Sequence, residues 1–322
     1  MQVTEMPGVP YCSRRRALGL TAAAPFTLAA FQPALAQAVS LRAGTSPTDA
    51  YAEPLYFAPS GVSAKSGVTM DVSLFSSSTA TAAGCASGAL DIGVADPIAI
   101  ANGVVHGIPF RILAPGSVYT GVSSSYVCVA RSSSITTAKD LNGSTMGAVT
   151  LGSSMAFVAT KAWLAGNGAD LASVKFVEMP YAAMAAAIER GTIAGASIAE
   201  PFISQLPPSV RVLANPNDAI GGRYATSAWF ATQSWLDRNA ALARRLSGLI
   251  YDVGRWSNGH PDESAVVLAG VTHLDPERAR QMHRATFATS NEPQAIALSL
   301  AAALKVDVLS RPVSVAELMA TL

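Results

Sequence analysis

Short apolar stretches alternate with small-residue or amphipathic stretches along most of the chain. The apolar stretches have the length and alternation of β-strands, and several end in a turn of Ser, Thr or Asp before a helical stretch. Such a repeated strand–loop–helix order predicts a mainly parallel sheet flanked by helices, an α/β fold. The expected strands are residues 39–44, 69–75, 90–95, 126–130, 145–149, 174–177, 194–198, 210–213 and 225–231.

The pattern restarts near residue 131 and changes again after residue 231, where amphipathic helical stretches follow one another. We therefore expect two lobes, each with its own sheet. Residues 39–126 with 229–322 form lobe I, and residues 127–228 form lobe II. The expected helices include residues 51–58, 153–166, 181–191, 236–256, 262–271, 276–287 and 293–304.

The N-terminal segment has the order of an export signal. Ser13 and three arginines, residues 14–16, precede an apolar run over residues 17–31 and small-residue cleavage sites that end at Ala36 and Ala38. The run is shorter than the roughly 20 residues that span a bilayer. We expect residues 1–38 to be removed and the mature protein to be periplasmic. The paired arginines after a serine suit the twin-arginine route, and the sequence leaves open whether that route or Sec is used.

Composition narrows the range of partners. The full chain has 22 basic and 21 acidic residues. Removal of residues 1–38 takes away three arginines and one glutamate, so the mature chain keeps 19 basic and 20 acidic residues. This near-neutral balance gives no support for nucleic acid or an anionic membrane as a partner. Two cysteines remain, Cys85 and Cys128. We expect two buried thiols, although an oxidising compartment also permits a disulfide between them.

Five stretches of the chain form a recognisable series: residues 41–45 (LRAGT), 88–96 (GALDIGVAD), 139–147 (KDLNGSTMG), 188–202 (IERGTIAGASIAEPF) and 229–256, which opens with WFAT. In this order they resemble the periplasmic substrate-binding proteins of nitrate/sulfonate/taurine-type ABC importers, a group that includes pyrimidine- and thiamine-precursor binders. The resemblance implies a two-lobed periplasmic binding protein type II fold that closes on a small molecule. It also implies an ABC permease as membrane partner, a monomer and no cofactor. Residues 59–68 depart from the family pattern, because they lack its Gly-aromatic-aromatic element.

Candidate ligand contacts gather in the turns that follow predicted strands. In open α/β sheets such turns face the ligand, and the first turn of the following helix offers free amide groups. Hydroxyls there can bind polar atoms or cap the helix, whereas carboxylates can accept from an amine or a ring N–H, and tyrosine faces suit flat ligands. The expected contacts are Thr45, Ser46, Tyr51, Ser76, Ser77, Ser78, Asp96, Ser153, Ser154, Glu200 and Tyr224. Arg223 is more typical of a solvated loop arginine than of a clamp for an acid.

Catalytic constellations are scarce. The four histidines are scattered, and the sequence has no Gly-x-Ser-x-Gly elbow, Walker loop or Gly-x-Gly-x-x-Gly turn. We expect no catalytic residue and no metal, and favour a solute binder for an ABC importer. A ligand-binding sensory protein and, less favoured, a pyrimidine-precursor synthase-like enzyme are the alternatives. The ligand remains open between a sulfonate or other anion and an amine or pyrimidine-like heterocycle. Two carboxylates among the candidates favour a small organic molecule with an N–H or amino group.

Overall fold

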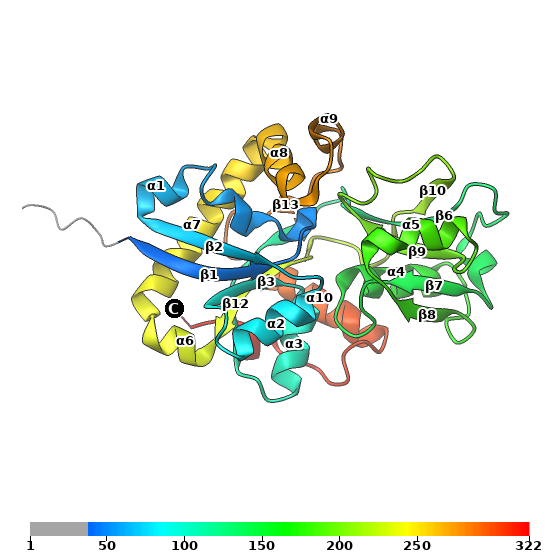
Figure 1. Ribbon diagram of the computed structural model, residues 1–322. Helices are drawn as coiled ribbons and strands as arrows, with labels where there is room; N and C mark the ends of the chain where they lie inside the picture. Colours follow the sequence, from blue (N-terminus) through cyan, green and yellow to red (C-terminus); the bar gives the residue numbers. More distant parts are fainter. Residues whose placement is uncertain (1–37, 322) are drawn as a thin grey trace, which may run out of the picture. The chain divides into compact units, whose positions relative to one another are not determined.

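The computed structural model describes residues 38–321. Its first five-stranded sheet has the order β2-β1-β3-β12-β4 (Figure 1). The strands β1 and β2, and β1 and β3, pair in parallel, whereas β12 is antiparallel to both of its neighbours. The bounds are β1 Val39–Thr45, β2 Val68–Leu74, β3 Ile92–Ala95, β4 Phe110–Pro115 and β12 Ala228–Thr232.

The second sheet repeats this plan with the order β10-β6-β9-β7-β8. Here β7 is parallel to β8 and β9, and β6 is antiparallel to both of its neighbours. The bounds are β6 Ser125–Ala130, β7 Thr145–Ala148, β8 Lys175–Glu178, β9 Gly195–Ala199 and β10 Val210–Ala214. Each sheet is thus mainly parallel with one reversed strand, which confirms the predicted α/β architecture of two lobes. The exact lobe boundaries stay a prediction.

A small third sheet lies where the chain passes between the lobes. It has the order β11-β5-β13, with β5 Ser117–Tyr119, β11 Tyr224–Ala225 and β13 Thr286–Phe287. β5 precedes β6 and β11 precedes β12, so both connections run side by side and pair antiparallel. The sequence pattern did not predict β4, β5 or this pairing.

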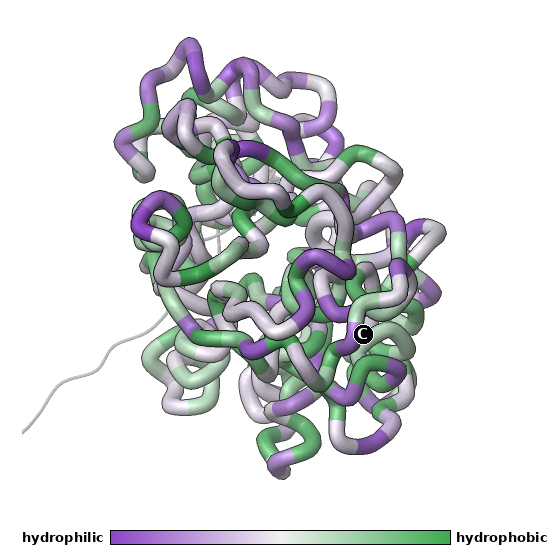
Figure 2. Tube along the Cα trace, turned by 90° about the vertical axis from the view of Figure 1, so that its right-hand side faces the viewer, coloured by the Kyte–Doolittle hydropathy of each residue, from purple (hydrophilic) through white to green (hydrophobic). Residues whose placement is uncertain are grey.

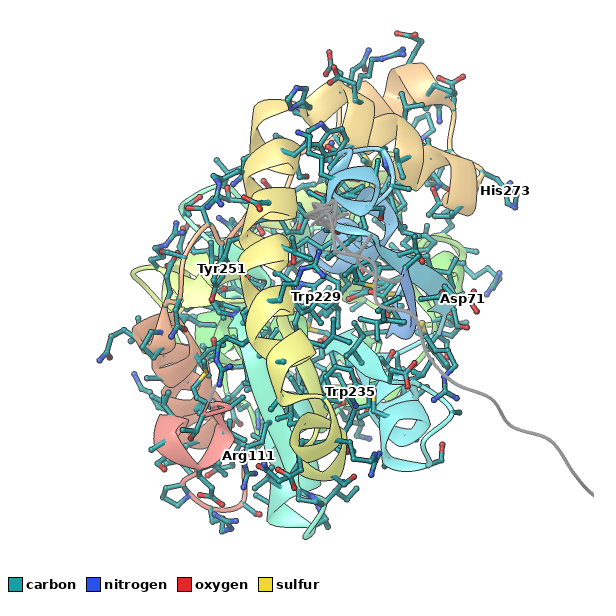
Figure 3. The ribbon with its side chains drawn as sticks, turned by 90° about the vertical axis from the view of Figure 1, so that its left-hand side faces the viewer. Asp71, Arg111, Trp229, Trp235, Tyr251 and His273 are labelled. Atoms are coloured by element: carbon teal, nitrogen blue, oxygen red, sulfur yellow. The ribbon has the colours of Figure 1, made fainter. Side chains whose placement is uncertain are left out.

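The helices cover the faces of the sheets. The long helix α7 lies across the first sheet over Trp229 (Figure 3), which is fully buried. Hydrophilic positions gather at the outer turns of the trace (Figure 2), as expected for apolar helix faces turned inward. The bounds are α1 Val62–Ser66, α2 Ser78–Ala86, α3 Pro97–Val105, α4 Met155–Gly166, α5 Tyr181–Glu189, α6 Gln233–Arg238, α7 Ala240–Gly259, α8 Pro261–Thr272, α9 Pro276–Arg280, α10 Pro293–Lys305 and α11 Val315–Leu318.

Two predicted helices are wrong. Residues 51–58 form parts of two short 3-10 helices, Asp49–Tyr51 and Glu53–Tyr56, because Pro54 stands at the start of the second and cannot donate within a longer helix. The helix expected over residues 276–287 ends at Arg280, and its last two residues form β13 instead. Two further 3-10 helices are Ala138–Leu141 and Pro216–Ala219.

Cys85 and Cys128 are free and buried, which confirms the expected thiols. Cys128 and its neighbour Val127 lie on β6 with their side chains on opposite faces of the second sheet. The side chains of Cys128 and Val127 therefore pack into two separate apolar clusters. The predicted export signal lies outside the described residues except for Ala38. Over residues 38–321 we find no helix with the length and apolar character needed to cross a bilayer.

Replacement by alanine should have opposite effects on stability at two glycines of α7, because one is closely packed and the other is not. A Cβ at Gly254 would lie 2.5 Å from the carbonyl oxygen of Ala288, whereas a Cβ at Gly248 would meet nothing within 4 Å. We expect Gly254→Ala to destabilise the protein by about 1–3 kcal/mol through overpacking. Gly248→Ala should stabilise it by roughly 0.5–1 kcal/mol through helix propensity. Urea unfolding of both variants checks this, and equal signs for the two would contradict the close packing of α7.

Candidate functional site

A cavity of about 130 Å³ lies where strand ends of both sheets meet. It is lined by the turns that follow β1, β2 and β3 and by those that follow β7, β8 and β9, so both lobes contribute. This is the edge at which open α/β sheets bind ligands. The lining residues are Ser46, Pro47, Thr48, Tyr51, Ser76, Ser77, Ser78, Asp96, Val149, Thr150, Ser153, Ser154, Pro180, Tyr181, Ala182 and Phe202.

Polar side chains cap the helices that begin at the cavity. Ser77 accepts from the amide of Ala80 at 3.3 Å in α2, and Ser154 accepts from Phe157 at 3.4 Å in α4. These bonds stabilise the helix starts and fix the turns that carry the hydroxyls. The same residues therefore cap helices and line the cavity, so the two roles weighed from sequence occur together.

Hydrogen bonds join the two lobes along the cavity wall. The hydroxyls of Thr79 and Ser153 lie 2.8 Å apart, and the side-chain amide of Asn102 donates to the carbonyl of Gly152. Asp96, which follows β3 in the first lobe, accepts from the amide of Met155 in the second lobe at 2.6 Å. These contacts hold the start of α4 against α2 and α3.

Asp96 is buried and accepts three hydrogen bonds. Its Oδ1 accepts from the amide of Ile98 at 3.3 Å, as the N-cap of α3. Its Oδ2 accepts from Met155 and from the hydroxyl of Tyr51 at 2.9 Å. Burial raises the pKa of this carboxyl to about 7, although its hydrogen bonds act in the opposite direction. Asp96 thus links both lobes, the aromatic wall and the first turn of α3.

Three aromatic side chains form a wall of the cavity. The rings of Tyr181 and Phe202 are stacked with their centroids 5.6 Å apart, and both line the cavity with Tyr51. Phe202 was not among the predicted contacts. Tyr181 opens α5 directly after β8. The wall gives a flat ligand an apolar face to pack against.

Thr48 is a functional candidate that the sequence did not single out. Its side chain is 4% exposed, and its hydroxyl has no hydrogen-bond partner within residues 38–321. Thr48 lines the main cavity and also a smaller one of about 40 Å³, which shares Tyr51 and Tyr181 with it. A buried hydroxyl without a partner carries a desolvation cost, which a bound polar group would remove.

Three predicted contacts do not line the main cavity. Thr45 lies behind it and donates its hydroxyl to the carbonyl of Tyr51 at 2.5 Å. The carboxylate of Glu200 accepts from the amide and hydroxyl of Ser204 at 3.0 and 3.1 Å, and burial raises its pKa to about 7. Tyr224 is fully buried in the small third sheet and donates to Asn217. The other eight predicted residues line the cavity together.

The lining restricts the available chemistry. Among the described residues that line the two cavities, none is a Lys, Arg, His or Cys. Arg223 lies at the surface, paired with Glu292. Across residues 38–321 no group of three His, Cys, Asp or Glu side chains could hold a metal ion. The cavity therefore offers hydroxyls, aromatic faces and one carboxyl, a set suited to holding a small polar molecule.

Solved structures with this fold cover most of the chain. The periplasmic aliphatic sulphonate binding protein SsuA of Escherichia coli is 16% identical with a TM-score of 0.70, over 88% of this chain and 92% of that one. The alkanesulfonate-binding protein SsuA of Xanthomonas axonopodis pv. citri, bound to MOPS, is 19% identical with a TM-score of 0.72, over 87% and 98%. The desulfurization enzyme DSZB is 16% identical with a TM-score of 0.64, over 88% and 96%.

These similarities show the fold, which is shared by binding proteins and by an enzyme. No curated protein sequence matched the chain. The sequence itself matches a protein family over residues 35–273, a range that takes in both sheets and every turn that lines the cavity. The chain therefore belongs to the NMT1-like family.

Proposed function

We propose that the protein is an extracytoplasmic solute-binding protein that captures a small polar organic molecule between its two lobes and delivers it to an ABC importer. The observation that carries the proposal is the cavity at the strand ends of both sheets, lined by the hydroxyl of Thr48, which has no partner among the described residues. A pocket built from two lobes closes around a ligand by hinge motion. The paired connections β5 and β11 provide the hinge.

The proposal includes a periplasmic location, release of the export signal near Ala36 or Ala38, and action as a monomer. The periplasmic binding proteins that share the fold support the location and the membrane permease as partner. A sensory role would use the same cavity with a different partner. Deletion of the gene separates the two, because a transport protein is required for uptake of its solute at limiting concentration.

An enzyme is less well supported, although DSZB shares the fold. The lining offers no thiol, imidazole or amine. Cys85 and Cys128 lie in apolar clusters, where burial raises the pKa of each thiol to about 12 and keeps it protonated. The aromatic wall and the ring of hydroxyls favour binding without reaction.

A thermal-shift screen of the purified protein tests the proposal. The panel holds sulfonates, pyrimidines, amines and aromatic acids at millimolar concentration. A solute that binds the folded state raises the Tm by mass action, by about 2.7 kcal/mol of stability at 100 times its Kd. A stabilising compound of any of these classes supports the proposal. A panel in which no compound raises the Tm contradicts it.

Thr48→Val should weaken solute binding without loss of stability. Valine keeps the shape of threonine but lacks the hydroxyl, which has no partner within residues 38–321. Loss of a hydrogen bond worth about 0.5–1.5 kcal/mol would raise the Kd of the best compound of the screen roughly 2- to 12-fold. Calorimetric titration measures the Kd, and thermal melting measures stability.

Ser63→Ala is the matched control. Ser63 is also buried with an unpartnered hydroxyl among the described residues, but it lies on α1 and lines neither cavity. We expect its substitution to leave the Kd unchanged. Equal effects of Thr48→Val and Ser63→Ala on the Kd would contradict a direct contact of Thr48 with the solute.

A further inference from the structure

Among the described residues that line the main cavity, Asp96 is the one Asp or Glu, and none is a Lys, Arg or His. Its side chain is 1% exposed, and the cap of α3 uses only Oδ1, through the amide of Ile98. The second oxygen, Oδ2, is not needed for that cap. It accepts from the hydroxyl of Tyr51 at 2.9 Å and, from the second lobe, from the amide of Met155 at 2.6 Å.

Met155 is the first residue of α4, a helix of 12 residues that begins in the second lobe. The first-turn amides and the macrodipole of a helix make this the place where a protein holds an anion. In this protein the carboxylate of Asp96, from the first lobe, occupies that position and accepts from the amide of Met155. A negatively charged solute therefore cannot bind this amide and is repelled by the carboxylate.

Among residues 38–321, no Lys, Arg or His side chain lines the cavity to offset this carboxylate. The titratable groups that face Asp96 are Tyr51, Tyr181 and Tyr224, which are neutral phenols in the physiological range. Two like charges about 5 Å apart at an effective dielectric constant near 20 repel strongly enough to weaken binding on the order of 100-fold. Neutral groups escape this repulsion and can still bond the hydroxyls of Thr48, Ser77 and Ser154.

We propose that Asp96 is a specificity-determining residue that excludes anionic solutes, so that the molecule bound between the lobes carries no negative charge. This inference rests on the proposed function and adds the class of solute. It separates the chain from the structural neighbours named as sulfonate-binding proteins. The hydroxyls, the aromatic wall and Asp96 together suit an uncharged or cationic organic molecule with hydrogen-bonding groups.

Ethanesulfonate and ethanesulfonamide test the proposal, because they have nearly the same shape and differ in charge. Calorimetric titration of the full protein at pH 8.5, where the Asp96 carboxyl is ionised, should give a Kd for the sulfonamide at least about tenfold below that for the sulfonate. In Asp96→Asn the sulfonate should bind at least about tenfold more tightly than in the wild type, with the sulfonamide changed less than threefold. Asp91→Asn removes the same charge from an exposed pair with Arg42 and should change neither Kd.

Two results would overturn the proposal: equal affinity of the wild type for both probes, or no gain of sulfonate affinity in Asp96→Asn. If no compound of any class binds, the proposed function fails instead.

The wild type offers a second measurement should Asp96→Asn fail to fold. The sulfonate is ionised at pH 5.5 and at pH 8.5, whereas the Asp96 carboxyl, whose pKa burial raises to about 7, is neutral only at the lower value. Sulfonate affinity should therefore rise about tenfold at pH 5.5, with the sulfonamide unaffected. Glu200 titrates in the same range, but its carboxylate lies outside the lining and is bonded to Ser204. A sulfonate affinity that does not change with pH would contradict the exclusion of anions by Asp96.

Discussion

Arg284→Met is expected to destabilise the protein by about 3–5 kcal/mol, because it leaves a buried carboxylate without its counter-charge. Asp49 is fully buried, and the guanidinium of Arg284 donates to its Oδ1 at 2.9 Å. The same guanidinium donates to the hydroxyls of Tyr56 and Ser264 at 3.1 and 3.0 Å. One side chain thus satisfies acceptors on three segments.

The exposed pair of Arg223 and Glu292 provides the control. Two guanidinium nitrogens of the arginine contact the carboxylate in this pair too, but the arginine side chain is 43% exposed, and exposed pairs contribute at most about 1 kcal/mol. Urea unfolding of Arg284→Met and Arg223→Met measures the difference. Similar losses in the two variants would contradict a buried role for Arg284.

The double variant Asp49→Asn with Arg284→Met should recover part of the stability, because no charge then remains buried.

Loss of the ion pair between Asp49 and Arg284 should also affect the cavity. The amide of Asp49 donates to the carbonyl of Glu200 in the second lobe at 3.1 Å, and the segment it anchors carries Thr48 and Tyr51. We therefore expect loss of the ion pair to weaken solute binding as well as folding.

Local rules were enough to predict much of the cavity from the sequence. Hydroxyls and carboxylates directly after apolar strands gather at one edge of a parallel sheet. This rule correctly brought together Ser77, Ser154 and Asp96, which come from different strands. Their position depends on strand direction and helix capping, both of which leave a signal within about ten residues.

The remaining features depend on contacts between distant segments. Glu200 also follows a strand, but Ser204 turns back to bond its carboxylate. Tyr224 is held in the third sheet, which forms only when β11 meets β5 about a hundred residues earlier in the chain. Whether the hydroxyl of Thr48 has a partner likewise depends on tertiary packing. No periodicity in the sequence encodes such pairings.

The burial of Glu53 also could not be predicted from the sequence. Its carboxyl has the largest expected effect on how the stability of the protein depends on pH. Its carboxyl is buried beneath α7, with Oε2 accepting from the indole of Trp229 at 2.6 Å and Oε1 without a partner within residues 38–321. A Cβ at Gly116 or Gly254 would lie 3.3 Å from one of these oxygens, so the backbone encloses the group closely. Burial raises its pKa from 4.5 to about 8, against the effect of the Trp229 hydrogen bond.

A raised pKa means that the folded state holds a proton that the unfolded state releases. The contribution to stability is complete below pH 4.5, decreases as the pH rises, and is lost above about pH 8. For Glu53 the loss amounts to about 4–5 kcal/mol between these limits. Asp96 and Glu200, whose pKa values are raised in the same direction, add to it. The protein should therefore be more stable at pH 5 than at pH 8.

Glu53→Gln isolates the contribution of this one carboxyl. Glutamine remains neutral at every pH and keeps an acceptor for the indole of Trp229, so the variant should lose less stability than the wild type between pH 5 and pH 9. Because Asp96 and Glu200 are present in both proteins, their contributions cancel in the comparison. Urea unfolding at intervals across this range measures both curves. If the curves of stability against pH were parallel for the variant and the wild type, Glu53 would bind its proton no more tightly in the folded state than in the unfolded state. The pKa of its carboxyl would then not be raised by burial.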